Sequence, residues 1–463
     1  MKRLLAPLCV GAASALALAA TPAPAQDVVV TNATVALGDG SDPIEGGTVI
    51  VEDGDVVFAG TPTPGQSFAT DTVIDAEGAW VTPGLFATVT TLGLWDVGAV
   101  SQSNDQRASR SPFSAALDAA PIVNPDSQHI LVHRAAGITR AGTTTLPSAS
   151  IFAGQGALID LGADPEPVMR ARAFQMVDMG EAAGRIAGGS RAAAHVLFRN
   201  ALREAQSYGE AARIPGQGAE RRDLRSGDDV PIDPRLAGRD TDRPNDVLLT
   251  RFDAAALVPV VRGEQKLYVA VERAADIRAV LALEDEFPQL DMVLVGASEG
   301  WLVAEEIAAA GVPVIADSLD DLPTGFDQLA ATQSNIGRMM RAGVTVALNA
   351  SSMQNPRRLP QYAGNLVALA KMPGASGLSW GEAFAAISSA PAAISGLDGR
   401  AGVLAPGALG DVVIWDGDPL EVTSVPTRVF IEGVEQPMDS HQSRLKERYR
   451  DLDESELPKA YDW

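Results

Sequence analysis

Residues 81–94, which read Val-Thr-Pro-Gly-Leu-Phe-Ala-Thr-Val-Thr-Thr-Leu-Gly-Leu, mark the point where the chain changes from one kind of structure to another. Before them, residues 28–60 contain short β-rich runs, and Asp53-Gly54 predicts a hairpin turn between two of these runs. After them, segments typical of strands alternate with segments typical of helices, which favours parallel β/α units. β-rich runs return at residues 411–415 and 428–431. We therefore expect one β-domain, built from both ends of the chain, beside a central α/β region.

The central region contains the expected elements of a barrel. Strands are predicted at residues 267–271, 292–295, 312–316 and 344–348, and helices at residues 275–287 and 301–310. Ser379 and Glu382 predict a capping box at the start of a further helix. A (β/α) barrel is the simplest fold with this alternation, and its functional residues are expected at the C-terminal ends of the strands.

Two parts of the sequence resemble the amidohydrolase superfamily, in particular imidazolonepropionases and prolidases. The first barrel strand of that family carries Pro-Gly-Leu-Ile-Asp-x-His-x-His, and Pro83-Gly84-Leu85 with the apolar Phe86 matches its beginning. Further motifs of the family follow in the usual order: Pro391-Ala392, Gly402-Val-Leu404, Gly407, Asp411-Val-Val413 and Gly417-Asp-Pro-Leu420. The resemblance covers residues 28–434. It implies an α/β fold with a (β/α)8 TIM-like barrel and a small composite β-sandwich formed by both termini.

The resemblance and the local composition together predict the domain boundaries. We expect a signal peptide at residues 1–25, the two parts of the β-domain at 26–82 and 401–437, the barrel at 83–400 and a charged tail at 438–463. Within the barrel, a polar insertion around residues 212–245 is rich in Arg, Asp, Gly and Pro, and we interpret it as a solvated loop.

The first 25 residues are typical of a secretory signal. Lys2 and Arg3 precede an apolar run, and Ala23-Pro24-Ala25 fits a small-x-small cleavage site. The only cysteine, Cys9, lies inside this segment, so the mature chain has no thiol for a disulfide or a soft-metal site. We therefore expect an exported protein of a bacterial periplasm, without a membrane span.

The charge of the chain limits its partners. The formal net charge is −23, with 59 acidic against 36 basic residues. Nucleic acids and anionic membrane surfaces are bound through basic patches, so this composition disfavours both. We expect instead an unidentified small-molecule ligand, a second copy of the chain or an intact amidohydrolase relative as the partner.

The resemblance also locates the positions where relatives hold a metal. They use histidines at the ends of strands one, five and six, and an aspartate on strand eight, to bind zinc or another divalent metal, which lowers the pKa of its water from 15.7 to about 7. The matching positions here are Val89, Thr91, Ala270, Gly296 and Ala350-Ser351-Ser352. We therefore expect no metal cofactor. Val89, Thr91, Ala270, Gly296 and Ser351 are expected to line a pocket at the barrel mouth, together with Gln155 of a polar loop at residues 154–157.

The four histidines of the chain do not replace the missing ligands. His129 and His133 are spaced to share one face of a helix, but a pair without a third ligand makes a poor metal site. We interpret both as helix-packing or surface residues. His195, in an Ala-rich helix, and His441, in the tail, are expected to be structural or solvated.

Three other residues are weak catalytic candidates. Gly296-Ala-Ser298-Glu-Gly300 matches the Gly-x-Ser-x-Gly nucleophile elbow between a strand and a helix, but such a serine needs a histidine base. Glu272 and Glu299 follow strands five and six and are expected either to bind a cation or a basic ligand in the mouth, or to form salt bridges with Arg273 and other arginines.

These observations favour a pseudoenzyme of amidohydrolase descent. The family hydrolyses carbon–nitrogen bonds other than peptide bonds, in cyclic amides and imidazolone rings, and also dipeptides. We expect this member to have lost the metal site and to act as a ligand-binding or partner subunit. Two alternatives stay open: an active amidohydrolase with unconventional ligands such as Asp96, Glu272 or Glu299, and a serine hydrolase built on Ser298.

Overall fold

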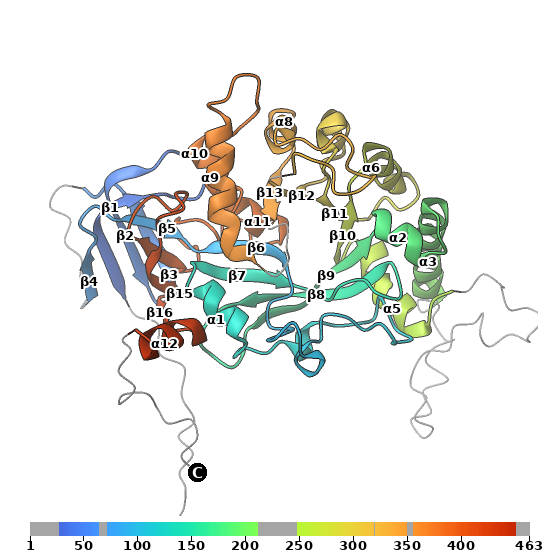
Figure 1. The fold of residues 1–463 in the computed structure, drawn as a ribbon, viewed down its shortest axis with the longest axis horizontal. Coiled ribbons are helices and arrows are strands. Elements are labelled where there is room, and N and C mark those ends of the chain that lie inside the picture. Colours follow the sequence, from blue (N-terminus) through green and yellow to red (C-terminus); the bar gives the residue numbers. More distant parts are fainter. Residues whose placement is uncertain (1–26, 64–71, 212–247, 319, 350–354, 451–463) are drawn as a thin grey trace, which may run out of the picture.

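The computed structural model describes residues 27–63, 72–211, 248–318, 320–349 and 355–450. These residues form two eight-stranded sheets, and helices surround one of the two (Figure 1). The predicted signal peptide, the insertion around residues 212–245 and Ser351 lie outside the described residues.

The barrel sheet contains eight strands in sequence order. They are β6 (Leu85–Thr90), β7 (Ile138–Thr143), β8 (Phe152–Asp160), β9 (Val168–Asp178), β10 (Lys266–Val271), β11 (Met292–Gly296), β12 (Val314–Asp317) and β13 (Val346–Asn349). The first and last strands, β6 and β13, lie next to each other, so the sheet nearly closes into the expected barrel. The strands predicted near residues 267, 292, 312 and 344 are all present as β10 to β13.

One strand departs from the regular barrel pattern. β8 runs antiparallel to both β7 and β9, and no helix separates these three strands. The prediction of a polar loop at residues 154–157 was wrong, because these residues lie in the middle of β8. Gly156 shows why small residues are needed there, since a Cβ at this position would lie 2.2 Å from the ring of Phe174.

Helices follow most of the other strands. The α-helices around the barrel are α1 (Gln128–Arg134), α2 (Glu181–Ile186), α3 (Arg191–Ala211), α5 (Arg251–Val261), α6 (Ala274–Leu281), α7 (Ala304–Ala310), α8 (Asn335–Arg341), α9 (Leu359–Leu369), α10 (Trp380–Ala385) and α11 (Ser389–Ile394). Short 3-10 turns are η1 (Ser101–Ser103), η2 (Ala120–Ile122), η4 (Ala282–Asp285), η5 (Gly300–Leu302) and η6 (Pro356–Arg358). The capping box of Ser379 and Glu382 is confirmed at the start of α10.

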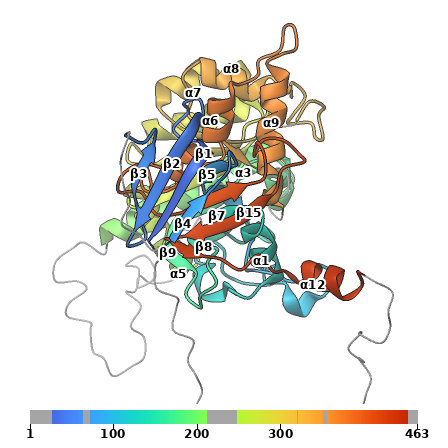
Figure 2. The same cartoon turned by 90° about the vertical axis from the view of Figure 1, so that its left-hand side faces the viewer.

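The β-domain takes strands from both ends of the chain. Its N-terminal strands are β1 (Val28–Val35), β2 (Ile44–Glu52), β3 (Asp55–Gly60), β4 (Thr72–Asp75) and β5 (Trp80–Pro83), and its C-terminal strands are β14 (Val412–Trp415), β15 (Pro426–Ile431) and β16 (Val434–Glu435). β5 pairs with both β1 and β14 and so joins the two groups. Figure 2 shows the N-terminal strands, in blue, beside the C-terminal strands, in red. The hairpin predicted at Asp53-Gly54 connects β2 and β3, and both of its residues have positive φ angles.

Apolar side chains from both groups of strands form the core of the β-domain. Val30 of β1 and Val49 of β2 share one buried cluster with Val412 of β14 and Phe430 of β15. The apolar side chains of the N-terminal strands therefore pack against those of the C-terminal strands, as in a β-sandwich.

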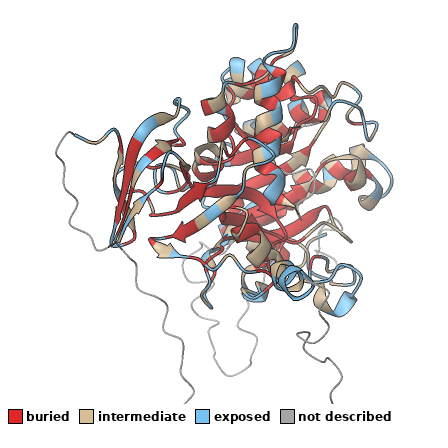
Figure 3. Cartoon of the chain, turned by 60° about the vertical axis from the view of Figure 1, so that its left-hand side comes forward, coloured by how far each residue is buried: buried red, intermediate tan, exposed pale blue. Residues whose placement is uncertain are grey.

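Most barrel strands are buried on both faces, whereas the first half of β9 is largely exposed (Figure 3). Inside the barrel, Val89 and Phe174 belong to one apolar cluster, and the ring of Phe174 stacks on Tyr268 at 4.3 Å. The outer face of the strands packs against the surrounding helices in a second, larger cluster. The barrel interior is thus a packed core rather than a pore.

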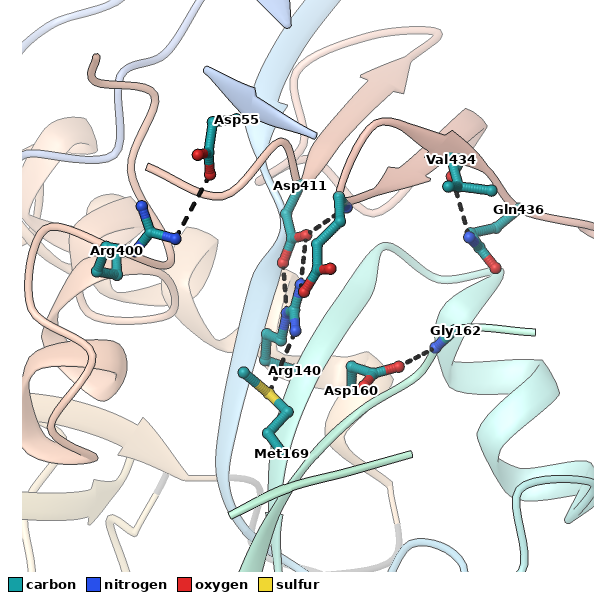
Figure 4. Close-up of polar contacts among 10 residues, drawn as sticks. Asp55, Arg140, Asp160, Gly162, Met169, Arg400, Asp411, Val434 and Gln436 are labelled. Atoms are coloured by element: carbon teal, nitrogen blue, oxygen red, sulfur yellow. Dashed lines mark hydrogen bonds and ion pairs between the residues drawn. The ribbon is translucent and has the colours of Figure 1, made fainter. Parts of the chain in front are cut away.

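A buried ion pair connects the barrel to the β-domain (Figure 4). Arg140 of β7 donates hydrogen bonds from Nε and Nη2 to the carboxylate of Asp411, just before β14, at 2.7 and 2.8 Å. Both side chains are almost fully buried, and Glu432 adds a further contact to Arg140 at 3.0 Å. Burial alone would raise the pKa of Asp411, but the charge of Arg140 holds it below its ordinary value.

The charged tail contains one described helix, α12 (His441–Arg448), which has no buried residues. Among the described residues, no helix is both long and apolar enough to cross a bilayer.

Candidate functional site

Four polar residues meet at one end of the barrel, which we call the mouth. Asp178 is the last residue of β9, Glu272 follows β10, Ser298 lies just beyond β11 and Asp317 is the last residue of β12. These strands are parallel to one another, so their C-terminal ends lie on the same side of the sheet. This is the side on which barrel proteins carry their functional residues.

The Glu272 carboxylate occupies the space beside Gly296, the position of the strand-six histidine in relatives. A Cβ built on Gly296 would lie 2.2 Å from Oε1 of Glu272, which is far shorter than a van der Waals contact. Gly296 also has a φ of +91°, a conformation that side-chain-bearing residues rarely adopt. The backbone and the neighbouring carboxylate therefore both favour glycine at this position.

Ser298 binds the same carboxylate. Its backbone N–H and its hydroxyl both donate to Oε2 of Glu272, at 3.0 and 2.6 Å. Burial raises the pKa of Glu272 to about 7, even though the two hydrogen bonds from Ser298 act in the opposite direction. Gln328 donates to the Ser298 hydroxyl at 3.2 Å, and the Ser298 side chain is buried.

Two further carboxylates lie near Glu272. Oδ2 of Asp320 is 3.2 Å from the hydroxyl oxygen of Ser298. Burial and the nearby charges of Asp320 and Glu272 raise the pKa of Asp317 to about 7. Oδ1 of Asp317 is inaccessible to solvent and has no hydrogen-bond partner among the residues that the structure describes. Near neutral pH this group of acids can therefore hold protons that isolated carboxyl groups would release.

The predicted salt bridge between Glu272 and Arg273 was wrong. Arg273 instead pairs with Asp276 in the first turn of α6, at 2.9 Å. The pKa of Glu272 is shifted by burial, by hydrogen bonds and by other acids, and no cation contributes to the shift.

Glu299 has a structural role. Its Oε2 accepts from the backbone N–H of Ala274, at the start of α6, and its Oε1 accepts from the backbone N–H of Ala330. Both oxygens are thus used to fix neighbouring segments, so the expected salt bridge of Glu299 with an arginine is also absent among the described residues.

The strand-one positions are filled by packed side chains. Val89 is buried in the apolar cluster inside the barrel. Thr91, just beyond β6, is fully buried, and its hydroxyl accepts a hydrogen bond from Gln106 at 3.0 Å. Ala270 of β10 packs against the same apolar cluster as Val89.

Gln155 does not lie at the mouth. It pairs with Gln175 of β9, which in turn pairs with Leu267 near the beginning of β10. Its amide oxygen is 3.5 Å from Nε2 of Gln265, the residue before β10. Because Gln265 and Glu272 flank opposite ends of β10, the expectation that Gln155 lines the mouth was wrong.

The histidines have partners elsewhere. His129 and His133 both lie in α1, as predicted; His129 stacks on Trp95 at 3.7 Å, and Nδ1 of His133 contacts the backbone oxygen of His129 at 2.6 Å. Burial lowers the pKa of His133 to about 4. His195 lies 3.6 Å from Asp276, which links α3 to α6. His441 is the first residue of α12 in the tail.

Asp96 also forms hydrogen bonds with residues at the start of α1. One of its carboxylate oxygens accepts from the backbone N–H of Gln128 at 3.3 Å, at the first residue of α1. The Asp96 backbone oxygen is bound by the side chains of Gln128 and His129.

The residues at the family's metal positions do not fit a divalent metal. Two are apolar side chains, one is a glycine whose space is taken by Glu272, and Thr91 is bound to Gln106. Zinc and related ions require nitrogen, oxygen or sulfur donors that converge on one point. In the part of the chain that the structure describes, no three His, Cys, Asp or Glu side chains converge in this way.

Sequence reasoning identified Glu272 and Ser298 but missed Asp317, Asp320 and Gln328. Asp317 directly follows the apolar run that predicted β12, so its position at a strand end was a usable signal. The sequence gives no such signal for Gln328. Its hydrogen bond to Ser298 depends on the conformation of residues 320–334, which follow β12 and lie beside the mouth.

None of these acids lines the cavity of about 230 Å³ that the structure contains. It is lined by residues 108–117, by Leu146 to Phe152 between β7 and β8, and by Leu197 and residues 248–253. Asp253 in its wall is fully engaged, since it accepts from the backbone N–H groups of Ser114 and Ala116 at 2.8 and 2.9 Å.

Comparisons with known proteins agree with the fold. A family model described as Amidohydro_3, amidohydrolase family, matches residues 270–433. The structure is similar to that of an amidohydrolase from Thermotoga maritima MSB8, with a TM-score of 0.71 and 21% sequence identity over 88% of this chain and 99% of the other. An ochratoxinase of A. niger has a TM-score of 0.49 at 15% identity, over 90% of this chain and 97% of the other.

A curated relative matches only a short stretch. Amidohydrolase tasK of Hapsidospora irregularis is 40% identical over 60 residues, which are 13% of this chain. The match spans only 6% of the length of that relative.

Proposed function

We propose that the chain is a member of the amidohydrolase superfamily that has lost the metal site and binds a ligand or a partner. The observation that carries the proposal is the contact between Glu272 and Gly296. The space of the strand-six ligand is occupied by a carboxylate that Ser298 holds with two hydrogen bonds. A histidine could enter only if Glu272 moved away.

The strand-one positions support the same proposal. Val89 contributes to the apolar packing inside the barrel, and Thr91 is held by Gln106. Neither residue offers a donor that is free to bind a metal. A barrel built in this way keeps its stability without an ion, because packing replaces coordination at these positions.

The mouth retains chemistry suited to binding a cation. The charge of Asp320 helps to raise the pKa of Glu272, and the charges of Asp320 and Glu272 help to raise the pKa of Asp317. A cationic group beside them would favour their ionised forms and would release protons on binding. The proposed small-molecule ligand is therefore a cationic one.

The proposal also includes export to a bacterial periplasm. It rests on the basic residues Lys2 and Arg3, the apolar run after them and the small residues at positions 23 and 25. Fractionation of cells that express the full chain, followed by mass spectrometry of the mature N-terminus, tests this part.

Metal analysis of the purified protein tests the central proposal. We expect less than stoichiometric zinc, manganese or iron after dialysis against each ion, and no hydrolysis of cyclic amides or dipeptides above the rate in buffer. Glu264→Gln is the control for Glu272→Gln, because Glu264 is exposed and lies before the first residue of β10, at the end opposite to Glu272. A stoichiometric ion that is lost only in Glu272→Gln, together with turnover, would instead support the unconventional metal site.

A serine hydrolase remains the second candidate because the Ser298 hydroxyl is 2.6 Å from a carboxylate with a pKa of about 7. Such a carboxylate is a suitable general base near neutral pH. However, the Ser298 side chain is only 3% exposed and also binds Gln328. Labelling by a fluorophosphonate probe that disappears in Ser298→Ala would favour this candidate, and we expect no labelling.

A further inference from the structure

The segment between β12 and α8 exposes large apolar side chains beside the mouth. Within residues 320–333, Leu322 is 76% exposed, Phe326 78% and Leu329 66%. Leu322 and Phe326 are the two most exposed large hydrophobic residues in the described chain. Single exposed hydrophobic residues are common, but several on one short segment indicate an interaction site. We call residues 320–333 the mouth loop.

The mouth loop is held in a fixed conformation. Glu181 makes two hydrogen bonds to the loop: its N–H donates to the Asp327 carboxylate at 2.8 Å, and its carboxylate accepts from the backbone N–H of Phe326 at 3.1 Å. Ala330 is bound on both sides, because its N–H donates to Glu299 and its oxygen accepts from the indole of Trp301. The exposed apolar side chains therefore project from an ordered backbone, which lowers the entropic cost of binding a partner.

The surroundings of the mouth loop are acidic. Between Arg278 and Arg338 the sequence contains eleven aspartates and glutamates and no lysine or arginine. The two flanking arginines are engaged, since Arg278 pairs with Glu306 at 2.7 Å and Arg338 lies over the ring of Trp301 at 4.4 Å. Asp320 and Asp321 directly precede Leu322. The loop thus presents apolar side chains within a field of negative charge.

Charge complementarity decides which occupant fits this surface. A second copy would bring an identical acidic loop, and each copy carries a net charge of −23, so the two would repel each other. A segment with lysine or arginine between apolar residues would cover the apolar side chains and neutralise the acids. We propose that the mouth loop is a docking surface for a polypeptide partner, which binds it through a segment that alternates apolar and basic side chains.

This inference rests on the partner-binding half of the proposed function and names its surface, but it does not depend on the loss of the metal site. It uses the exposed face of the mouth loop and not the acids beneath it, so it holds whether or not the barrel is catalytic. Failure of the docking test would leave the metal analysis unaffected, and the reverse is also true.

Titration of the full-length protein with fluorescein-labelled synthetic peptides tests the proposal. The probe alternates leucine and lysine; one comparison peptide replaces lysine by glutamate and another replaces leucine by serine. We expect the leucine–lysine peptide alone to bind, with an affinity that falls as salt is added. The variant Leu322→Ser/Phe326→Ser/Leu329→Ser should bind it at least about tenfold more weakly, because hot-spot side chains carry most of a binding energy.

A matched control separates this surface from general charge attraction. Val73→Ser/Val196→Ser/Val422→Ser removes three hydrophobic residues that are 57%, 67% and 73% exposed and lie outside the mouth loop. This control should bind the leucine–lysine peptide like the wild type, and Asp321→Lys should weaken binding. Equal binding by the wild type and the mouth-loop variant would overturn the proposal. A wild-type dimer that the mouth-loop variant abolishes would also overturn it and would identify a second copy as the occupant.

Discussion

Oε1 of Glu272 lies 2.2 Å from the position that a Cβ on Gly296 would take, so these two residues exclude any larger side chain at position 296 as they stand. We predict that Gly296→Ala lowers the free energy of unfolding by about 2 kcal/mol or more, from this overlap together with the positive φ. In a Glu272→Ala background the overlap is gone and only the backbone strain stays, so the loss should be smaller. Urea denaturation of the four proteins of this cycle measures the difference, and equal losses in both backgrounds would contradict the steric explanation.

The raised pKa values of Glu272 and Asp317 predict how stability depends on pH. Both are about 7 in the folded protein, against ordinary values of 4.5 and 3.8. Between these limits the folded state holds protons that the unfolded state has released, so stability falls as pH rises and the loss is complete above pH 7. Glu272→Gln should flatten this fall and should also lower the pKa of Asp317. Denaturation midpoints measured from pH 4 to pH 8 check the slope, with Glu264→Gln as the unchanged reference.

The Arg140–Asp411 pair should matter far more than an exposed pair. Removing one partner leaves the other charge buried, so Arg140→Met or Asp411→Asn alone is expected to cost about 3–5 kcal/mol of stability. The double variant Arg140→Met/Asp411→Asn should lose less than the sum of the two single changes. Arg278→Ala breaks an exposed pair with Glu306, whose charges solvent screens, and should cost far less stability. A loss from Arg140→Met no larger than that of Arg278→Ala would show that the buried pair is not a main connection between the domains.

The contact between Glu181 and the mouth loop predicts local rather than global change. Glu181→Gln weakens its acceptance from the Phe326 N–H, so residues 320–333 should exchange amide hydrogens faster while the midpoint of unfolding stays nearly constant. Glu305→Gln, an exposed change in the first turn of α7, serves as the control. Hydrogen exchange read by mass spectrometry distinguishes the two. Unchanged exchange in the mouth loop would mean that Asp327 and Ala330 hold it without Glu181.

The architecture was predictable because it is encoded in local patterns. Apolar runs near residues 267, 292, 312 and 344 became β10 to β13, and the motifs at both ends indicated that one β-domain is built from both. The strand β8 was missed because Gly154 and Gly156 resemble turn residues. The two glycines are needed because Leu117 packs against Gly154 and the Phe174 ring packs against Gly156, which leaves no room for a side chain. These contacts come from distant parts of the chain, so no local sequence pattern reveals them.

The candidate site was less predictable than the fold. The sequence located Glu272 and Gly296 at strand ends, but their contact depends on the positive φ of Gly296 and on the side-chain conformation of Glu272. The expected salt bridge to Arg273 failed because Asp276 lies closer within the same helical turn. Which carboxylate pairs with Arg273 depends on differences of a few ångströms between side-chain positions. The spacing of residues in the sequence does not specify such differences.

The order in which the chain is synthesised has a consequence for its folding. β5 pairs with β14, and Asp411 reaches back to Arg140 across 271 residues, so the β-domain cannot be completed until the ribosome has passed the last strands. β5 and Arg140 therefore lack these partners until the C-terminal strands have been synthesised. Because the last strands complete the β-domain and Asp411 also binds a barrel strand, a C-terminal truncation should destabilise both domains.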